Sequence, residues 1–296
     1  MKRSAIARGR KLSSPGARLR FALQTERPLQ IVGVIHAYAA ILAESTGFKA
    51  LYLSGAGVAN ACFGIPDIGW TTLQDVLSEV RRITQRTRLP LLVDADTGWR
   101  NPGLTVREMI RAGAAAIHLE DQVEAKRCGH LKGKKLVSTA AMVNRIKAAL
   151  GGKTDPAFVV MARTDAAAVE GLDSAIARAS AYQEAGADMI FAEALTTLEQ
   201  YRAMCAAVQI PVLANMTEFG KTPLFELGQL REAGVRLALY PLSAFRAMNL
   251  AALKVYRTLR ARGTQKRVLS SMQTRTDLYD FLGYKNIELD RRATRT

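Results

Sequence analysis

Short apolar runs alternate with longer, partly polar stretches along most of this chain. Four runs carry a glycine near their start and end in a polar or turn residue, and two others begin at a proline. Glycine suits a helix end because positive φ costs it little, and proline suits the first position of a strand. The pattern therefore predicts eight short buried strands. They lie at 29–35, 46–54, 89–96, 112–120, 158–165, 185–193, 210–217 and 233–241.

The stretches between these strands have helical character, and Thr71-Thr72-Leu73-Gln74 offers a capping-box start. Apolar strands alternating with helices indicate a parallel sheet covered on both faces, and eight such units close most simply as a (β/α)₈ TIM-type barrel. An open doubly wound sheet is the alternative, but Gly33-Val34-Ile35-His36 is not the glycine-rich nucleotide loop expected there. The predicted helices lie near 36–46, 71–86, 104–112, 138–150, 172–185, 197–207, 222–233 and 243–262.

The barrel domain is predicted to occupy residues 14–262, with a C-terminal helical extension at 263–296. A helical segment between Gly263 and Gly283 is not needed for barrel closure, so we expect it to pack on a neighbouring subunit or to cover the mouth. Residues 1–13 are basic and are expected to form a disordered extension. A short organellar targeting segment is the alternative there; otherwise the pattern favours a cytoplasmic protein.

The formal net charge is +16, from 42 basic and 26 acidic residues, which favours anionic partners. A nucleic-acid-binding protein would explain the charge, but no aromatic residue interleaves the basic start of the chain. No apolar run approaches the ~20 residues that cross a bilayer, so no membrane partner is expected. Small polyacids remain the favoured partners.

Polar residues collect where the predicted strands end, which is where barrel enzymes place their active sites. The strand bodies stay apolar, so this concentration predicts an enzyme rather than a catalytically silent barrel. The residues are Ser54, Asp94, Asp96, Glu120, Arg163, Asp165, Glu193, Asn215, Thr217 and Tyr240.

Asp94 and Asp96 are two positions apart in a strand, so their side chains should point to the same face. Two converging carboxylates repel each other unless a cation or a proton lies between them. Mg²⁺, with Mn²⁺ as a substitute, suits such oxygen ligands, and Glu120 is a candidate for the outer coordination sphere. The alternative is a salt-bridged structural pair, or one aspartate capping the next helix.

A long basic loop at 122–137 follows Glu120, and loops of this length at a barrel mouth are often lids. Cys128 lies there among Lys126, Arg127 and His130, and positive neighbours lower a thiol pKa. The loop thus predicts a thiol able to transfer a proton. Cys62 and Cys205 are instead expected to be buried structural cysteines.

Two arginines, Arg163 and Arg246, follow predicted strands and offer forked donors for carboxylates. Either could instead balance Asp165 or Glu193. Arginines around the candidate cation site at Asp94 and Asp96 predict a small substrate with more than one carboxylate.

Several motifs together resemble the 2-methylisocitrate lyases of the isocitrate lyase and phosphoenolpyruvate mutase superfamily. The likeness runs from about Ser14 to Tyr284. Its motifs are Y-L-S-G-A-G (52–57), V-D-A-D-T-G (93–98), L-E-D-Q (119–122), K-R-C-G-H (126–130), M-A-R-T-D-A (161–166), A-N-M-T-E-F-G (214–220), Y-P-L-S-A-F-R-A-M-N (240–249) and G-T-Q-K…M-Q-T-R (263–275).

The resemblance implies a magnesium-dependent cleavage of 2-methylisocitrate to pyruvate and succinate, as in propionate catabolism by the methylcitrate cycle, and a homotetramer whose C-terminal helices exchange between subunits. Asp94 and Asp96 would hold the metal, Cys128 would be the catalytic acid, and Tyr52 is a candidate base. The substrate contacts it implies are Ser54, Gly55, Ala56, Gly129, His130, Arg163, Glu193, Asn215, Met216, Thr217, Arg246 and Arg275.

Two departures from the family pattern bear on the substrate. Ala56 replaces a glycine, and the stretch around 99–103 is shorter by about one helical turn. Isocitrate lyases are longer and prefer Lys-Lys before Cys-Gly-His, whereas 2,3-dimethylmalate lyases and oxaloacetate hydrolases have similar size. Those two activities therefore stay open alongside the favoured one.

Overall fold

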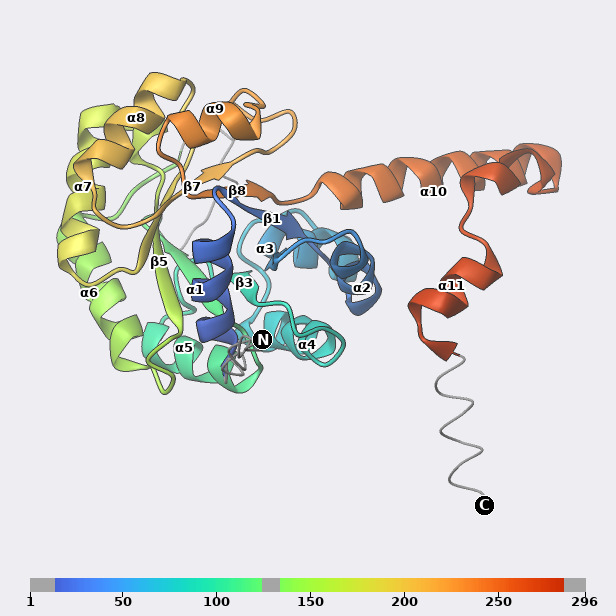
Figure 1. The fold of residues 1–296 in the computed structure, drawn as a ribbon, viewed down its shortest axis with the longest axis horizontal. Coiled ribbons are helices and arrows are strands. Elements are labelled where there is room, and N and C mark those ends of the chain that lie inside the picture. The colour runs from blue at the N-terminus through green and yellow to red at the C-terminus, as the bar shows by residue number, and fades with distance from the viewer. Residues whose placement is uncertain (1–13, 124–133, 285–296) are drawn as a thin grey trace, which may run out of the picture.

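Eight parallel strands form a closed barrel in this computed structural model, which describes residues 14–123 and 134–284 (Figure 1). Closure is direct, because β1 pairs with both β2 and β8. The predicted TIM-type barrel is confirmed, and every strand lies inside a predicted run. The strands are β1 (Leu29–Gly33), β2 (Ala50–Leu53), β3 (Leu91–Asp94), β4 (Ala116–Glu120), β5 (Val159–Thr164), β6 (Met189–Ala192), β7 (Val212–Asn215) and β8 (Leu237–Tyr240).

Helices between the strands wrap the outside of the barrel (Figure 1). Two short segments after β2, α3 and η1, and the short η2 after β5 were not predicted. The elements are α1 (Pro15–Thr25), α2 (Ala37–Ser45), α3 (Gly55–Val58), η1 (Ala59–Phe63), α4 (Leu73–Thr84), α5 (Pro102–Arg111), α6 (Thr139–Gly151), η2 (Ala166–Ala168), α7 (Leu172–Glu184), α8 (Leu198–Ala207), α9 (Leu227–Glu232), α10 (Ser243–Arg262), η3 (Lys266–Ser271) and α11 (Arg275–Phe281).

Two apolar layers hold the barrel together. Successive strand residues point to opposite faces, so Leu51 and Leu53 pack outward against helices while Ala50 and Tyr52 point into the barrel. All four β2 positions are buried, as expected for a parallel strand covered on both sides. The same alternation decides which residues reach the barrel mouth.

Helix α1 closes the amino-terminal end of the barrel and was not predicted as an element. Its Leu19, Ala22 and Leu23 belong to the same apolar cluster as the inward strand residues. The start signal was present, since Ser14 Oγ accepts a hydrogen bond from Ala17 N at 3.2 Å and Pro15 follows it. Basic residues within α1 obscured its apolar face.

Two predicted helix boundaries need correction. The capping box of α4 begins at Thr72 rather than Thr71, and Asp75 closes it at the third helical position. Helix α9 begins at Leu227 rather than near 222. Pro223 lies between the predicted and the observed start of this helix, and the residue before a proline disfavours helical backbone.

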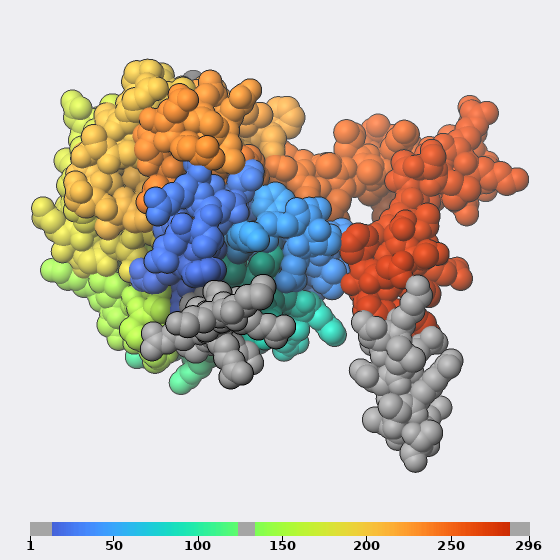
Figure 2. All heavy atoms as spheres, viewed as in Figure 1, coloured from blue at the N-terminus to red at the C-terminus, as the bar shows by residue number. Residues whose placement is uncertain are grey.

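The last helices leave the barrel. Helix α10 extends away from it, and η3 and α11 follow beyond (Figures 1 and 2). A hydrogen bond from Tyr38 Oη to Gln273 Oε1, at 2.7 Å, ties the segment before α11 to α2. Within the described ranges, no helix is both long and apolar enough to span a bilayer.

Candidate active site

The inward-facing positions change from apolar to polar at the carboxyl-terminal ends of the strands. On β2 the inward series runs from Ala50 through Tyr52 to Ser54, and on β4 from Ala116 through His118 to Glu120. A pocket opens at this end. It is lined by Tyr52, Ser54, Ala56, Asp67, Asp94, Arg163, Phe191, Asn215, Thr217, Leu239, Pro241, Leu242 and Arg246. Seven of the substrate contacts and site residues predicted from the sequence thus share one pocket with the metal candidate Asp94.

Asp94 and Asp96 are buried and converge on one backbone position. Asp94 Oδ2 accepts from Gly55 N at 3.1 Å, and Asp94 Oδ1 accepts from Asp96 N at 3.2 Å. A Cβ added at Gly55 would lie 3.1 Å from Asp94 Oδ2 and 3.6 Å from Asp96 Oδ1. Both carboxylates therefore face the same small space, in which glycine leaves the most room.

This donor set fits a hard divalent cation. Carboxylate oxygens are the ligands Mg²⁺ prefers, and Mg²⁺ keeps several waters and needs only one or two carboxylates. Within the described part of the chain, no three His, Cys, Asp or Glu side chains form a metal-binding group. Asp94 and Asp96 are thus the two carboxylates of the described residues that face this space.

His118 lies beside Asp94, its register partner on β4, and was not singled out from the sequence. It is fully buried, with Nε2 at 2.9 Å from Tyr52 Oη and 3.6 Å from Asp94 Oδ1. Its ring stacks on Tyr52 and meets the edge of Phe191. His118 thus connects the candidate base Tyr52 to the candidate metal ligand Asp94. A histidine two positions before Glu120 on an apolar strand was the available signal.

Arg163 is the centre of a buried ion-pair network. Its Nε and Nη2 bind both oxygens of Asp165 at 3.0 and 3.1 Å, and Glu193 and Glu120 lie at 3.3 and 3.5 Å. Burial alone would lower the Arg163 pKa, but these carboxylates hold it well above its ordinary value. Arg163 therefore balances buried carboxylates, as the structural alternative required. It also lines the pocket, so its geometry fits substrate binding as well.

Asp165 is held ionised by two buried cations. Lys134 forms a second buried ion pair with it, at Oδ1, which also accepts from Arg163 Nη2. Although burial raises the pKa of Asp165, the charges and hydrogen bonds of Arg163 and Lys134 lower it to about 2. Asp121, which follows Glu120 in sequence, points outside the barrel. Thr164 Oγ1 and Tyr182 Oη donate hydrogen bonds to it there at 2.8 and 2.9 Å.

A second chain of hydrogen bonds lines the β6–β7 side of the pocket. Asn215 Nδ2 donates to Glu193 Oε2 at 3.2 Å, and Thr217 Oγ1 donates to Asn215 Oδ1 at 2.7 Å. These bonds fix the Asn215 amide. Met216, between them, packs into the outer apolar cluster and its N–H donates to Leu239 O at 2.8 Å. Its side chain therefore lies away from the pocket.

The remaining predicted site residues divide into three groups. Arg246, on the first turn of α10, lines the pocket and lies 3.7 Å from Glu218. Arg275 begins α11, which lies away from the barrel, and is not a lining residue (Figure 1). Cys128, Gly129 and His130 lie outside the described residues. Asp67, on the loop before α4, lines the pocket and was missed because no strand ends there.

The other two cysteines differ in environment. Cys205 is half-buried in the outer core, and burial raises its pKa to about 11, as a structural thiol requires. Cys62 is exposed, so its expected burial was wrong. It lies on η1, a segment that the sequence pattern did not predict.

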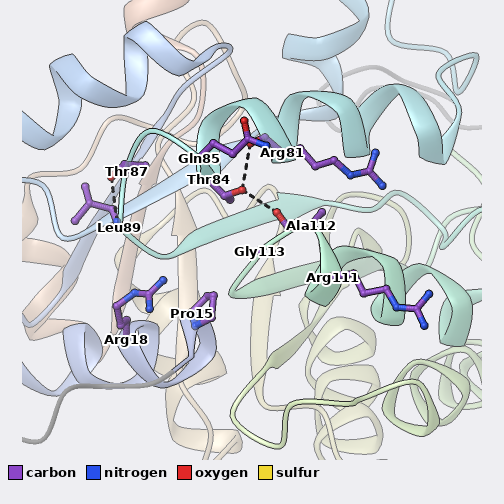
Figure 3. Close-up of a pocket in the computed structure, with 10 residues that line it drawn as sticks. All are labelled: Pro15, Arg18, Arg81, Thr84, Gln85, Thr87, Leu89, Arg111, Ala112 and Gly113. Atoms are coloured by element: carbon purple, nitrogen blue, oxygen red, sulfur yellow. Dashed lines mark hydrogen bonds between the residues drawn. The ribbon is translucent and has the colours of Figure 1, made fainter. Parts of the chain in front are cut away.

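A separate cavity of about 410 Å³ lies at the opposite, amino-terminal end of the barrel (Figure 3). Arg81 and Arg111 line it from the last turns of α4 and α5, and Figure 3 shows both side chains extending to the same side. Basic residues there offset the negative ends of the helix dipoles. The polar residues of the candidate active site collect at the other end of the barrel.

The closed barrel and the polar pocket at the carboxyl ends of its strands define a (β/α)₈-barrel enzyme. A protein-family profile described as phosphoenolpyruvate phosphomutase matches residues 19–260. The chain is 59% identical to a 2-methylisocitrate lyase of Shewanella oneidensis over 278 residues, covering 93% of this chain and 95% of that protein. It is also 59% identical to a 2-methylisocitrate lyase of Escherichia coli over 281 residues, with 94% and 95% covered.

Solved structures agree. A 2,3-dimethylmalate lyase superposes with a TM-score of 0.87 at 34% identity, covering 95% of this chain and 96% of that one. An oxaloacetate acetylhydrolase bound to 3,3-difluorooxalacetate gives 0.88 at 33%, with 95% and 97% covered. The chain belongs to the 2-methylisocitrate lyase family, within the phosphoenolpyruvate mutase and isocitrate lyase superfamily. It is a carbon–carbon lyase by that membership.

Proposed function

We propose that this chain cleaves 2-methylisocitrate into pyruvate and succinate, the step that serves propionate catabolism in the methylcitrate cycle. The main support is the buried pair Asp94 and Asp96 facing Gly55 beside a pocket lined by Arg163 and Arg246. The relatives that share 59% identity carry that activity in their names. The dimethylmalate lyase and the oxaloacetate acetylhydrolase are more distant, at 34% and 33%.

The charge balance of the site supports a metal requirement. Asp94, Asp96, Glu120, Asp165 and Glu193 are all buried, whereas Arg163 and Lys134 are the buried cations beside them among residues 14–123 and 134–284. A polycarboxylate would not enter such a site without added positive charge. Asp94 and Asp96 would hold Mg²⁺, or Mn²⁺, with Glu120 in the outer sphere. Bound there, the ion supplies Lewis-acid stabilisation of negative charge on substrate oxygens.

The residues around the pocket divide the remaining work. Ser54, Gly55 and Ala56 would contact the substrate at the start of α3, where Ser54 Oγ already accepts from Gly57 N at 3.2 Å. Arg246 and the amide of Asn215 would bind carboxylates, and the bonds from Thr217 to Asn215 and from Asn215 to Glu193 orient that amide. Fixed donors of this kind stabilise charge as it develops without having to reorganise.

The proposed reaction moves two protons. Tyr52, as phenolate, takes the proton of the substrate hydroxyl, and His118 at 2.9 Å orients the phenolic oxygen. The carbon–carbon bond next to that hydroxyl then breaks, its electron pair leaves with the succinate half, and the other half becomes the keto group of pyruvate. Cys128 gives its proton to the succinate carbanion. Before the next turnover Tyr52 releases the proton it took and the thiolate takes up one proton from solvent, so both groups return to their starting states.

Steady-state assay of three substrates tests this proposal together with its metal requirement. We expect release of pyruvate from 2-methylisocitrate at a kcat/KM at least tenfold above that for isocitrate or 2,3-dimethylmalate. A chelator should abolish turnover, and added Mg²⁺ should restore it, because Asp94 and Asp96 hold the ion by only a few oxygens. Faster cleavage of dimethylmalate, or activity indifferent to the chelator, would refute the corresponding part.

We also infer a homotetramer in which α10 packs on a neighbouring subunit. Within this chain α10 is 20 residues long with no buried residue. Leu250 and Tyr256 are 71% and 68% exposed. Apolar patches of this kind mark protein interfaces.

Light scattering of a Leu250→Lys/Tyr256→Lys variant checks this assembly. We expect the mass to fall from four chains toward one, since buried lysines oppose the apolar contact. The matched control is Lys254→Gln on the same helix, which removes a charge but no apolar surface. A wild-type mass of one chain, or a variant that remains tetrameric, contradicts the inference.

A further inference from the structure

The loop from β3 to α5, which carries the candidate metal ligand Asp96, has an unusual backbone. Asp96, Trp99 and Arg100 have φ values of 46°, 44° and 64°, in the left-handed region that side chains other than glycine disfavour. Gly98, with φ of 92°, adds a fourth such position. Residues in this region persist only where their surroundings hold them there.

Several hydrogen bonds hold this loop from inside. Glu120 N donates to Asp96 O at 2.9 Å, and Gly98 N donates to Ala95 O at 2.8 Å. Thr105 Oγ1, from the first turn of α5, donates to Gly98 O at 2.9 Å. These bonds join the loop to β4 and to the helix that follows it.

A further bond joins the loop to a different part of the site. The indole Nε1 of Trp99 donates to Thr71 O at 2.9 Å. Thr71 is buried and directly precedes Thr72, which caps α4. The loop that ends at Thr71 also carries Asp67, a pocket-lining residue. The Trp99 ring packs against the outer core, so its N–H is held in a defined direction.

We propose that Trp99 is a positioning residue for the metal site. By anchoring its own left-handed backbone to Thr71, it keeps Asp96 in the conformation that turns the carboxylate toward Gly55 and Asp94. Trp99 touches no substrate and acts through Asp96. This inference rests on the proposed Mg²⁺ site and adds a residue that sets the affinity of that site.

Titration calorimetry with Mg²⁺ alone tests the inference on the full chain. Trp99→Phe keeps an aromatic ring but removes the N–H donor, and one lost hydrogen bond should raise the Kd for Mg²⁺ by about three- to tenfold. Trp70→Phe is the matched control, because it makes the same change at the 69% exposed tryptophan of the neighbouring loop. Its Kd should equal that of the wild type.

A second control separates positioning from general destabilisation. Thr84 Oγ1 donates to Ala112 O at 2.7 Å, joining α4 to α5 at the opposite end of the barrel (Figure 3). Thr84→Val removes this comparable tether and should lower Tm while leaving the Kd for Mg²⁺ unchanged. An equal loss of Mg²⁺ affinity in Thr84→Val would overturn the positioning role.

A double-variant cycle tests whether Trp99 acts through Asp96. In an Asp96→Asn background, Trp99→Phe should cause little further change in Kd, because the carboxylate it positions is gone. The same fold-change in both backgrounds would overturn the inference, as would an unchanged Kd in Trp99→Phe. A wild-type chain that binds no Mg²⁺ would instead reject the proposed metal site itself, and the inference with it.

Discussion

Replacing Cys128 by serine is expected to lower kcat by about 10²–10⁴-fold, the range that a positioned general acid contributes. A serine hydroxyl is a far weaker acid than a thiol flanked by Lys126, Arg127 and His130, so it cannot protonate the carbanion in time. Binding of Mg²⁺ should stay near that of the wild type, because Asp94 and Asp96 are untouched. Single-turnover kinetics and calorimetry measure the two effects separately.

The control for this prediction is Cys62→Ser. It makes the same substitution at an exposed thiol, and its turnover should match that of the wild type. Normal kcat in Cys128→Ser would reject the thiol as the acid. Loss of Mg²⁺ binding together with turnover would show that the loop holds the metal site rather than delivering a proton.

Replacing Arg163 by methionine is expected to lower the free energy of unfolding by about 3–5 kcal/mol, the cost of removing one partner of a buried ion pair. Methionine keeps much of the length and the packing of the stem but leaves Asp165, Glu193 and Glu120 without that cation. The pKa of Asp165, now held at about 2, should rise. Urea unfolding at neutral pH gives the stability difference.

Arg202→Met is the matched control for Arg163→Met. Arg202 also pairs with a carboxylate, Glu199 at 2.9 Å, but both side chains are largely exposed at 48% and 77%. Exposed pairs contribute about 0–1 kcal/mol, so this variant should remain close to the wild type. If both variants lost the same small amount, the Arg163 network would be no stronger than a surface pair.

Much of the fold followed from local signals along the chain. Gly47, Gly113, Gly186 and Gly234 all have positive φ just before a strand, which is the conformation their helix-ending positions require. The same pattern located Asp94, Glu120 and Arg163, because polar residues that end apolar strands of one barrel must meet at its mouth. Because side chains alternate between the two faces of a strand, every second strand residue could then be placed inside the barrel.

Other features depend on contacts between separate segments of the chain. His118 occupies an inward position like its apolar neighbours, and nothing in a single sequence shows that Tyr52 and Asp94 come from adjacent strands to meet it. Asp67 reaches the pocket from a loop rather than a strand end. Met216 lies within the motif at 214–220, but the alternation along the chain turns its side chain away from the pocket.

The eightfold alternation, the parallel barrel and the end at which its polar residues collect could be predicted from the chain, because they depend on the spacing of apolar residues and on glycine and proline at element ends. The pairing of charges became visible only in three dimensions. Arg163 binds Asp165 rather than standing free, and the Asp96 backbone is left-handed beside an indole tethered to Thr71. Such choices depend on distances of a few ångströms between strands and loops, to which a linear pattern of residues is insensitive.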